Sequence, residues 1–396
     1  TTRTRILGVR NGADGQIVFI DTPGIHRPLH RLNVRMVDVA VQSISQADVV
    51  CAVADATEAV GGGDQFFGGA REFLFHRRDA ALEDFALDLG YSGVGITTAE
   101  PFPLVAEELT KRREPYRWVI DGRLKMLDGA TPKNVMPEAK SIISTVYDYA
   151  REAFPPELVG RLGRLYQSRS YLAPKHRING ARRQLFRDFL ESKGLKVMHG
   201  FDLNVAERMA AARGGAVTFG RNNFAYTRDA GSFVVLMAYT VDAELEYDEP
   251  TVEAPCPENC RLCIDACPTG ALEPFKLNPR KCIAFNTMMT QDGYGPSLSD
   301  RIPVEIREKM GSWVHGCDIC QEVCPRNQRR LRAKLPANEF LSLIGARFDL
   351  HKVLLLTDEY YESVLRPVAY NYLRQKKYFQ RNAAIALGNS GDRSHV

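Results

Sequence analysis

The sequence has no apolar run that approaches the roughly 20 residues needed to cross a bilayer. No secretory leader is recognisable at its start, so we do not expect a small secreted domain held by disulfides. A Gly-x4-Gly-Lys-Ser/Thr loop is absent, and so is an Asn-Lys-x-Asp element, which leaves no cradle for nucleotide phosphates. What remains is a chain of 396 residues, 44% hydrophobic and 25% charged, which is typical of a globular protein with two to four domains.

Cysteine is concentrated in one region. Eight of the nine cysteines form two runs, Cys256-x3-Cys260-x2-Cys263-x3-Cys267-Pro and Cys282 followed by Cys317-x2-Cys320-x3-Cys324-Pro. A 4Fe-4S cluster needs four thiolates around one point, and in two-cluster ferredoxins the cysteine before proline serves the other cluster. We therefore predict two 4Fe-4S clusters. The predicted ligands are Cys256, Cys260, Cys263 and Cys324 for one cluster, and Cys267, Cys282, Cys317 and Cys320 for the other.

Zinc and disulfides are the alternatives for these cysteines. Zinc sites use paired Cys-x2-Cys knuckles and do not need the repeated x3-Cys-Pro ending. Disulfides suit small secreted domains, whereas clusters and free thiols favour the reducing cytoplasm. The ninth cysteine, Cys51, lies in an apolar stretch and is predicted to be a small buried core residue.

The net charge of +4 is unevenly distributed. Few acids accompany the basic residues that follow Cys324. These residues are Arg326, Arg329, Arg330, Arg332, Lys334, Arg374, Lys376, Lys377 and Arg381. Such an asymmetry suits a polyanion such as RNA, and it suits an ordinary solvated helical face equally well.

Residues 1–66 differ in character from the rest. Residues 16–24 predict a buried strand that ends in Asp21-x-x-Gly24, and residues 47–56 predict the next parallel strand. The runs TTRTRILGV and IVFIDTPGIH resemble the Era-type GTPases of ribosome assembly, in which Asp-x-x-Gly senses the nucleotide. Because the phosphate loop is missing, the resemblance implies an incomplete P-loop G domain, and GTP binding is not expected. The chain starts without methionine, and we expect a fragment or a fusion.

The sequence from 67 to 250 alternates strand and helix patterns, which predicts an α/β body. The predicted strands are 90–96, 141–147 and 231–237, and the predicted helices are 70–89 and 179–193. We expect a ferredoxin-like domain with both clusters at 251–335 and an α-helical segment at 336–396. In that last segment, Thr357 is predicted to cap a helix and residues 381–388 to start a further one.

Three segments resemble the epoxyqueuosine reductase family, namely 263–271, 280–285 and 315–327. Residues 380–389 are similar to the HEAT-like helical repeat of that family. The resemblance covers about residues 70–396. It implies that the α/β domain binds cobalamin and that the clusters supply electrons one at a time for the removal of the epoxide oxygen from epoxyqueuosine in a tRNA anticodon.

The resemblance also implies site residues. Asp202 is the best match to the acid that supplies the proton, and a turn-forming or helix-capping role is the alternative for it. Arg208, Arg221 and Asn222 are implied to contact the cofactor. The chain departs from the family at 219–223, where a Gly-x-x-Gly-Lys turn is usual, at 169–172, where Asp-Tyr-His is usual, and in the three-residue spacer after Cys256.

Three functions are therefore weighed. The first is an iron-sulfur reductase that acts on tRNA and takes electrons from a reduced ferredoxin or a flavodoxin-type donor. The second is a ferredoxin-type electron carrier without a corrinoid, which corrinoid binding would distinguish from the first. The third is an Era-like RNA-binding GTPase, and the absent phosphate loop argues against it.

Overall fold

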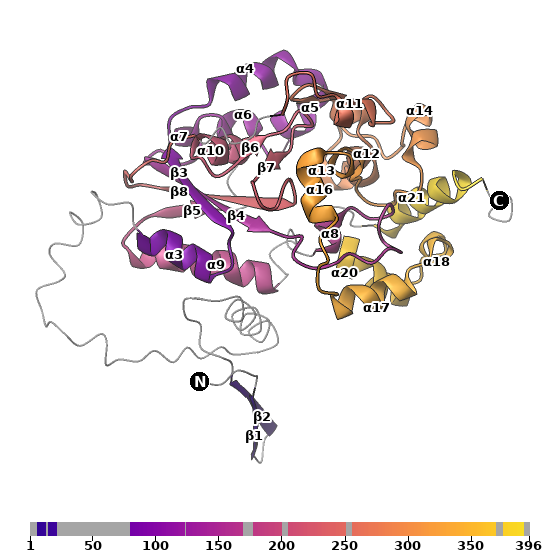
Figure 1. Ribbon diagram of the computed structural model, residues 1–396, viewed down its shortest axis with the longest axis horizontal. Helices are drawn as coiled ribbons and strands as arrows, with labels where there is room; N and C mark the ends of the chain where they lie inside the picture. Colours follow the sequence, from indigo (N-terminus) through magenta and orange to yellow (C-terminus); the bar gives the residue numbers. More distant parts are fainter. Residues whose placement is uncertain are drawn as a thin grey trace, which may run out of the picture.

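Figure 1 shows the computed structural model, which describes residues 6–12, 15–21, 80–122, 124–168, 177–199, 205–250, 256–369 and 375–391. The strands are β1 (Ile6–Gly12), β2 (Gly15–Asp21), β3 (Gly93–Thr98), β4 (Ser141–Asp148), β5 (Val197–His199), β6 (Thr218–Phe219), β7 (Ala225–Tyr226), β8 (Val234–Val241), β9 (Leu272–Glu273) and β10 (Lys276–Leu277). The helices before residue 250 are α3 (Ala80–Asp88), α4 (Pro103–Lys111), α5 (Arg113–Ile120), α6 (Met126–Gly129), α7 (Pro132–Val135), α8 (Arg164–Gln167), α9 (Arg177–Ser192) and α10 (Glu207–Arg213). The later helices are α11 (Leu262–Asp265), η2 (Pro279–Lys281), α12 (Ile283–Met288), α13 (Gln291–Tyr294), α14 (Val304–Arg307), η3 (Glu308–Met310), α15 (Ile319–Glu322), α16 (Pro325–Leu331), α17 (Glu339–Arg347), α18 (Leu350–Leu354), α19 (Asp358–Tyr360), η4 (Tyr361–Leu365), α20 (Arg366–Ala369) and α21 (Lys376–Gly388).

The largest sheet has four strands in the order β3-β4-β8-β5, and all three pairs are antiparallel. The predicted strands 90–96, 141–147 and 231–237 are found as β3, β4 and β8, and both β3 and β8 begin three residues later than expected. Strands and helices alternate along the chain, which gives the mixed α and β content of the prediction. The alternation is more often associated with parallel sheets, and here the connections return the chain antiparallel.

The two faces of this sheet carry separate cores, because successive strand residues point to opposite faces. On one face Ile143 and Tyr239 pack with Phe186 of α9 and with helix α3. On the other face Ile142 and Ala238 pack with α10 and with the segment around α7. Figure 1 shows α3 and α9 on one side of the sheet and α10 on the other.

The predicted helix 179–193 is found as α9, which begins two residues earlier. Its buried face includes Phe186 and Leu190, one turn apart. Gly194 follows the helix with a φ of 79°, the left-handed conformation that often ends helices. At 16 residues α9 is the longest helix described, and none of the described helices is long and apolar enough to cross a membrane.

The cysteine-rich segment from 256 to 331 consists of short helices joined by turns and of the antiparallel pair β9 and β10. Cys282 directly precedes α12, and Cys324 directly precedes α16. Pro325 occupies the first position of α16, where a missing N–H costs nothing and the fixed φ favours the helix. Each of these two cysteines is therefore the residue before the first turn of a helix, which fixes its backbone conformation.

The last helices share one core, which includes Ile344 of α17, Val353 of α18, Leu365 of η4 and Phe379 of α21. The predicted cap is confirmed, since the Oγ1 of Thr357 accepts a hydrogen bond from the N–H of Tyr360 at 3.2 Å. The helix expected from residue 381 is found as α21, which begins earlier, at Lys376. The HEAT-like repeat stays a prediction.

In the front segment, β1 and β2 form an antiparallel pair, with Ile6 opposite Asp21 and Gly12 opposite Gly15. Residues 16–21 of the predicted strand 16–24 are therefore found in β2. Gly24, the predicted strand 47–56 and Cys51 lie outside the described residues, as do Thr1 and Thr2. The Era-type resemblance stays a prediction.

We predict that Phe186→Ala will lower the free energy of unfolding by about 3–5 kcal/mol, because the ring is fully buried between α9 and the sheet. Its ring lies 5.8 Å from that of Tyr91 and 4.8 Å from that of Tyr239. The measurement is urea unfolding followed by circular dichroism. Leu185→Ala is the matched control, since that side chain is 38% exposed, and it should change stability by no more than about 1 kcal/mol. Equal effects of the two changes would contradict this packing.

Candidate iron-sulfur site

Four free thiols form what we term the first cysteine group, Cys256, Cys260, Cys263 and Cys324. Cys263 lies in α11, which packs against α15 of the second run. The pKa of Cys263 is raised to about 11, first by burial and then by the charges of Cys324, Cys256 and Cys260. Cys324 therefore lies near Cys263 of the other run, in agreement with the predicted exchange of ligands.

The second cysteine group comprises Cys267, Cys282, Cys317 and Cys320, which are also free thiols. Burial raises the pKa of Cys282, Cys317 and Cys320. The charge of Cys267 adds to the rise in all three cases. Cys267, which comes from the first run, is thus close to the cysteines that follow it in the chain.

Main-chain N–H groups point at sulfurs of the second group. The N–H of Ala271 lies 3.4 Å from the Sγ of Cys267. Main-chain N–H groups of Ala284 and Phe285 donate to Cys282 and lower its pKa against the larger effect of burial. Such donors stabilise a thiolate and influence the potential of an iron-sulfur cluster.

Among the described residues, no three His, Cys, Asp or Glu side chains gather closely enough to hold a single metal ion. Zinc would require four ligands around one ion. In a 4Fe-4S cluster each of the four thiolates binds a different iron. The residues of the two groups fit that donor chemistry, with four thiols in each.

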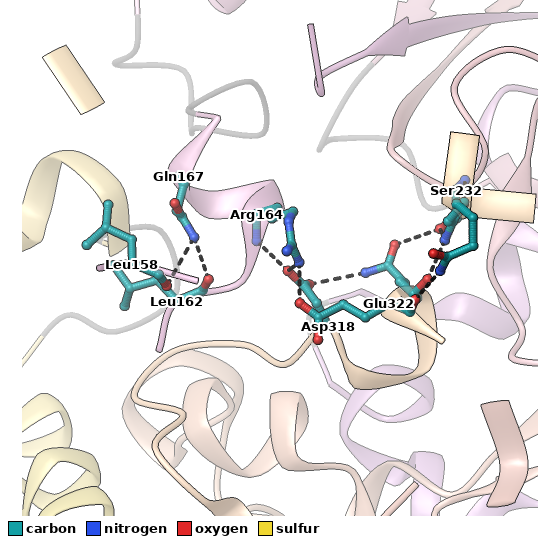
Figure 2. A network of polar contacts seen from close by, with 10 residues as sticks. Leu158, Leu162, Arg164, Gln167, Ser232, Asp318 and Glu322 are labelled. Atoms are coloured by element: carbon teal, nitrogen blue, oxygen red, sulfur yellow. Dashed lines mark hydrogen bonds and ion pairs between the residues drawn. The ribbon is translucent and has the colours of Figure 1, made fainter. Parts of the chain in front are cut away.

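A buried ion pair joins the second cysteine group to α8 (Figure 2). Asp318 follows Cys317 and accepts hydrogen bonds from the main-chain N–H of Arg164 at 2.8 Å and from its Nη1 at 3.1 Å. The same Nη1 lies 2.6 Å from the Oε1 of Glu322. Burial raises the pKa of Asp318, and Arg164 opposes this rise. Asp318 also raises the pKa of Cys317 and Cys320, so its charge acts on both thiols.

The polar contacts continue from Asp318 toward the sheet (Figure 2). Gln321 donates to Asp318 at 3.2 Å and accepts from the hydroxyl of Ser232 at 2.8 Å. Asn327 accepts from the N–H of Ser232 at 2.9 Å and donates to its hydroxyl at 2.8 Å. Next to Ser232, a Cβ on Gly231 would lie 2.1 Å from the Oδ1 of Asn327, so only glycine fits there.

Two of the predicted cofactor residues lie in the turn between β6 and β7. Asn222 is buried, and its amide donates to the hydroxyl of Tyr226 at 2.8 Å and to the carbonyl of Cys320 at 3.2 Å. The Asn222 amide therefore joins this turn to the second cysteine group. The guanidinium of Arg221 lies 5.6 Å from the ring centroid of Phe275, and its buried Nε has no hydrogen-bond partner in the described part of the chain.

The third predicted cofactor residue, Arg208, reaches the same turn, where its Nη1 donates to the carbonyl of Asn223 at 2.5 Å. The preceding Glu207 accepts a hydrogen bond from the N–H of Ala238 at 3.0 Å. Ala238 lies in β8, next to Tyr239, which pairs with the last residue of β5. Burial raises the pKa of Glu207 to about 7, while the Ala238 N–H and the charges of Arg208 and Arg183 act in the opposite direction.

The predicted proton donor, Asp202, lies outside the described residues, and so do residues 169–172. Sequence reasoning missed Arg164 and Glu207. Arg164 lies in a stretch without a motif, and only its spatial contact with Asp318 reveals it. Glu207 directly precedes Arg208, so its place beside a predicted cofactor residue was the available signal.

His315 is a buried side chain two residues before Cys317. Its ring lies between those of Tyr166 and Phe379, with centroids 4.6 and 5.6 Å away. Burial lowers its pKa to about 3, so the imidazole is neutral. Neither ring nitrogen has a hydrogen-bond partner among the residues that the structure describes.

Several of the basic residues after Cys324 form ion pairs or hydrogen bonds within the fold. Arg330 lies 2.5 Å from Asp148, and Arg329 lies 2.6 Å from Asp229. Arg326 donates to Thr218 and lies over the ring of Tyr226, while Arg381 donates to two main-chain carbonyls. Arg332 and Lys334 remain exposed, and Arg374 lies outside the described residues. Basic composition therefore overstates the charge that is available to a polyanion.

Comparison with known proteins identifies the family. The 4Fe-4S double cluster binding domain matches residues 256–327. The epoxyqueuosine reductase of Escherichia coli K12 is 31% identical over 337 residues, which is 78% of this chain and 80% of that protein. The enzyme of Bacillus subtilis 168 is 30% identical over 329 residues, which is 79% of each chain.

The chain belongs to the epoxyqueuosine reductase family. That family consists of oxidoreductases, and solved structures agree with the assignment. The epoxyqueuosine reductase of Streptococcus thermophilus aligns with a TM-score of 0.63 at 25% identity, over 79% of this chain and 82% of that one. An epoxyqueuosine reductase bound to an epoxyqueuosine-modified tRNA-Tyr stem loop aligns with a TM-score of 0.62 at 26% identity, over 80% and 82%.

We predict that Glu207→Gln will become increasingly stabilising as the pH rises. A carboxyl whose pKa is raised on folding binds a proton more tightly in the folded state, so the wild type loses stability as the pH rises from about 4.5 to about 7. The amide keeps the acceptor for Ala238 without the charge. The stability advantage of the variant should grow by roughly 1–2 kcal/mol between pH 5.5 and pH 8, measured by urea unfolding.

The matched control for this prediction is Glu191→Gln, on an exposed part of α9. It should show the same difference between the two pH values as the wild type. An advantage of Glu207→Gln that stays constant with pH would contradict a pKa near 7.

We predict that Cys260→Ser and Cys282→Ser will each leave about four of about eight irons after anaerobic reconstitution with iron and sulfide, because each serine removes one ligand of a different cluster. Iron and acid-labile sulfide analysis provides the measurement. The two variants should retain different electron paramagnetic resonance signals. Zinc in place of iron in the wild type would contradict the cluster assignment.

Proposed function

We propose that this chain is a cytoplasmic epoxyqueuosine reductase, which passes electrons through two 4Fe-4S clusters to the modified base of a tRNA. The observation that carries the proposal is the division of eight free thiols into two groups of four, each with one cysteine exchanged between the two runs. Free thiols persist in the reducing cytoplasm. The first cluster would be held by the first cysteine group and the second cluster by the second.

The reaction sets the requirements for the site. Conversion of an epoxide to an alkene breaks two C–O bonds and consumes two electrons and two protons, with release of water. Each 4Fe-4S cluster carries one electron at a time. A general acid is needed at the leaving oxygen, and we propose Asp202 for that role on the basis of its match to the family.

Cobalamin is part of the proposal. When bound, it would supply a metal centre that collects single electrons and delivers a pair to the substrate. Arg221 supports the fit, because its buried Nε has no partner among the described residues and the amides around a corrin ring are hydrogen-bond acceptors. Arg208 would act beside it at the same turn, whereas Asn222 would support the turn through its contact with Cys320.

The partners follow from the same chemistry. A tRNA anticodon stem loop would be the substrate, as it is the ligand of the related enzyme. A reduced ferredoxin or a flavodoxin-type protein would be the one-electron donor. The domain limits 67–250, 251–335 and 336–396, the HEAT-like nature of the last segment and the Era-like origin of residues 1–66 belong to the proposal as well.

The decisive assay is conversion of epoxyqueuosine to queuosine in a tRNA stem loop, followed by mass spectrometry of the nucleosides. The reconstituted chain, incubated with cobalamin and a chemical reductant, should convert the base. Asp202→Asn should lower the rate at least about 100-fold with unchanged iron content, since general acid catalysis contributes that much.

Asp188→Asn, on an exposed part of α9, is the matched control and should keep full activity. Retention of about one cobalt per chain after desalting is expected alongside turnover. Eight irons with neither cobalt nor turnover would overturn the reductase proposal and favour a plain electron carrier.

A further inference from the structure

A carboxylate is buried directly beside predicted ligands of the second cluster. Asp318 lies between Cys317 and Cys320 in the chain, and its side chain is only 4% exposed. It accepts three hydrogen bonds, two from Arg164 and one from Gln321, at 2.8, 3.1 and 3.2 Å. The guanidinium of Arg164, which is always protonated, pairs with this carboxyl at 3.1 Å. A negative charge is therefore held at a fixed place in the ligand loop.

Arg164 supplies the opposite charge from outside the cysteine-rich segment. Its side chain is 10% exposed, and its Nη1 contacts both Asp318 and Glu322 (Figure 2). Because its own N–H also donates to Asp318, the two residues are fixed at two points. The N–H of Gly163 donates to the carbonyl of His315 at 2.8 Å, which aligns the two segments just before the pair.

The ligand loop of Cys260 and Cys263 in the first cysteine group carries a more exposed ion pair. The nearest counterpart in sequence is the ion pair of Arg261 and Asp265, which lies around α11 at 3.1 Å. Both of its side chains are more than half exposed, so water screens their charges. In the second group the charges lie away from water, where electrostatic effects are larger.

We propose that Arg164 and Asp318 tune the reduction potential of the second cluster relative to the first, and thereby set the direction of electron transfer between the clusters. The inference rests on the proposed function. Reduction of a 4Fe-4S cluster from the 2+ to the 1+ state adds one negative charge. A nearby carboxylate opposes that step, and a guanidinium favours it. Arg164 and Asp318 act on the cluster as positioning residues, without ligating iron.

The test is a potentiometric titration of the reconstituted full chain with dithionite and mediators, followed by electron paramagnetic resonance. Cys260→Ser and Cys282→Ser assign the two signals. Asp318→Asn should shift the midpoint of the second cluster to a more positive value, because a negative charge is lost. Arg164→Gln should shift it to a more negative value. The midpoint of the first cluster should move less in both variants.

Shifts of the midpoint in opposite directions indicate a charge effect. Loosened packing would instead shift the midpoint of both variants in the same direction or lower their iron content. Glu322→Gln is a second route if either variant loses its cluster, and it should give a smaller positive shift because Glu322 is 32% exposed. Arg187→Gln, in an exposed pair on α9, is the matched control and should move neither midpoint.

Unchanged midpoints in Asp318→Asn and Arg164→Gln, or shifts in the same direction, would overturn the inference while leaving the proposed function intact. A wild-type chain that binds no cluster iron would instead overturn the proposed function, and the inference with it. Iron analysis before each titration distinguishes the two failures.

Discussion

The hydrogen bonds between Arg164 and Asp318 are the interaction on which the site depends. They join the loop that carries Cys317 and Cys320 to the short helix α8. A buried carboxylate without a partner would cost several kcal/mol, so the arginine stabilises the loop in this position. Ser232 and Asn327 add neutral hydrogen bonds on the other side, and Asn222 adds one to the carbonyl of Cys320.

The sheet and the cysteine-rich segment are also joined through the turn between β6 and β7. The turn between β6 and β7 contacts the second cysteine group through Asn222, and it contacts α10 through Arg208. The same turn therefore touches the cluster loop and the helix that follows the proposed proton donor. Glu207 joins that helix to Ala238 of β8. The turn between β6 and β7 thus joins the second cysteine group to α10.

The sequence predicted what depends on local spacing. The match to a double-cluster domain agrees with the intervals between the cysteines and with Pro268 and Pro325, while the division of the ligands into two sets stays a prediction. Strands β3 and β4 followed from runs of β-branched residues, and the cap at Thr357 from one hydroxyl. The antiparallel return of every strand did not follow, since strand direction depends on how the connecting segments pack.

Other parts of the site were hidden for the same reason. Arg164 and Asp318 are 154 residues apart, so no pattern in the chain links them. The use of Asn222 as a structural contact was likewise invisible, because the matching residue type in the family suggested a cofactor role. The basic residues after Cys324 showed the limit of composition, since Arg330 and Arg381 are engaged within the fold.

Anomalous diffraction at the iron absorption edge, from crystals of the anaerobically reconstituted chain, tests the central claim most directly. The account predicts two iron cubes, one ligated by Cys256, Cys260, Cys263 and Cys324 and the other by Cys267, Cys282, Cys317 and Cys320, with Asp318 beside the latter. A single cube, or Cys324 on the same cube as Cys317 and Cys320, would contradict it.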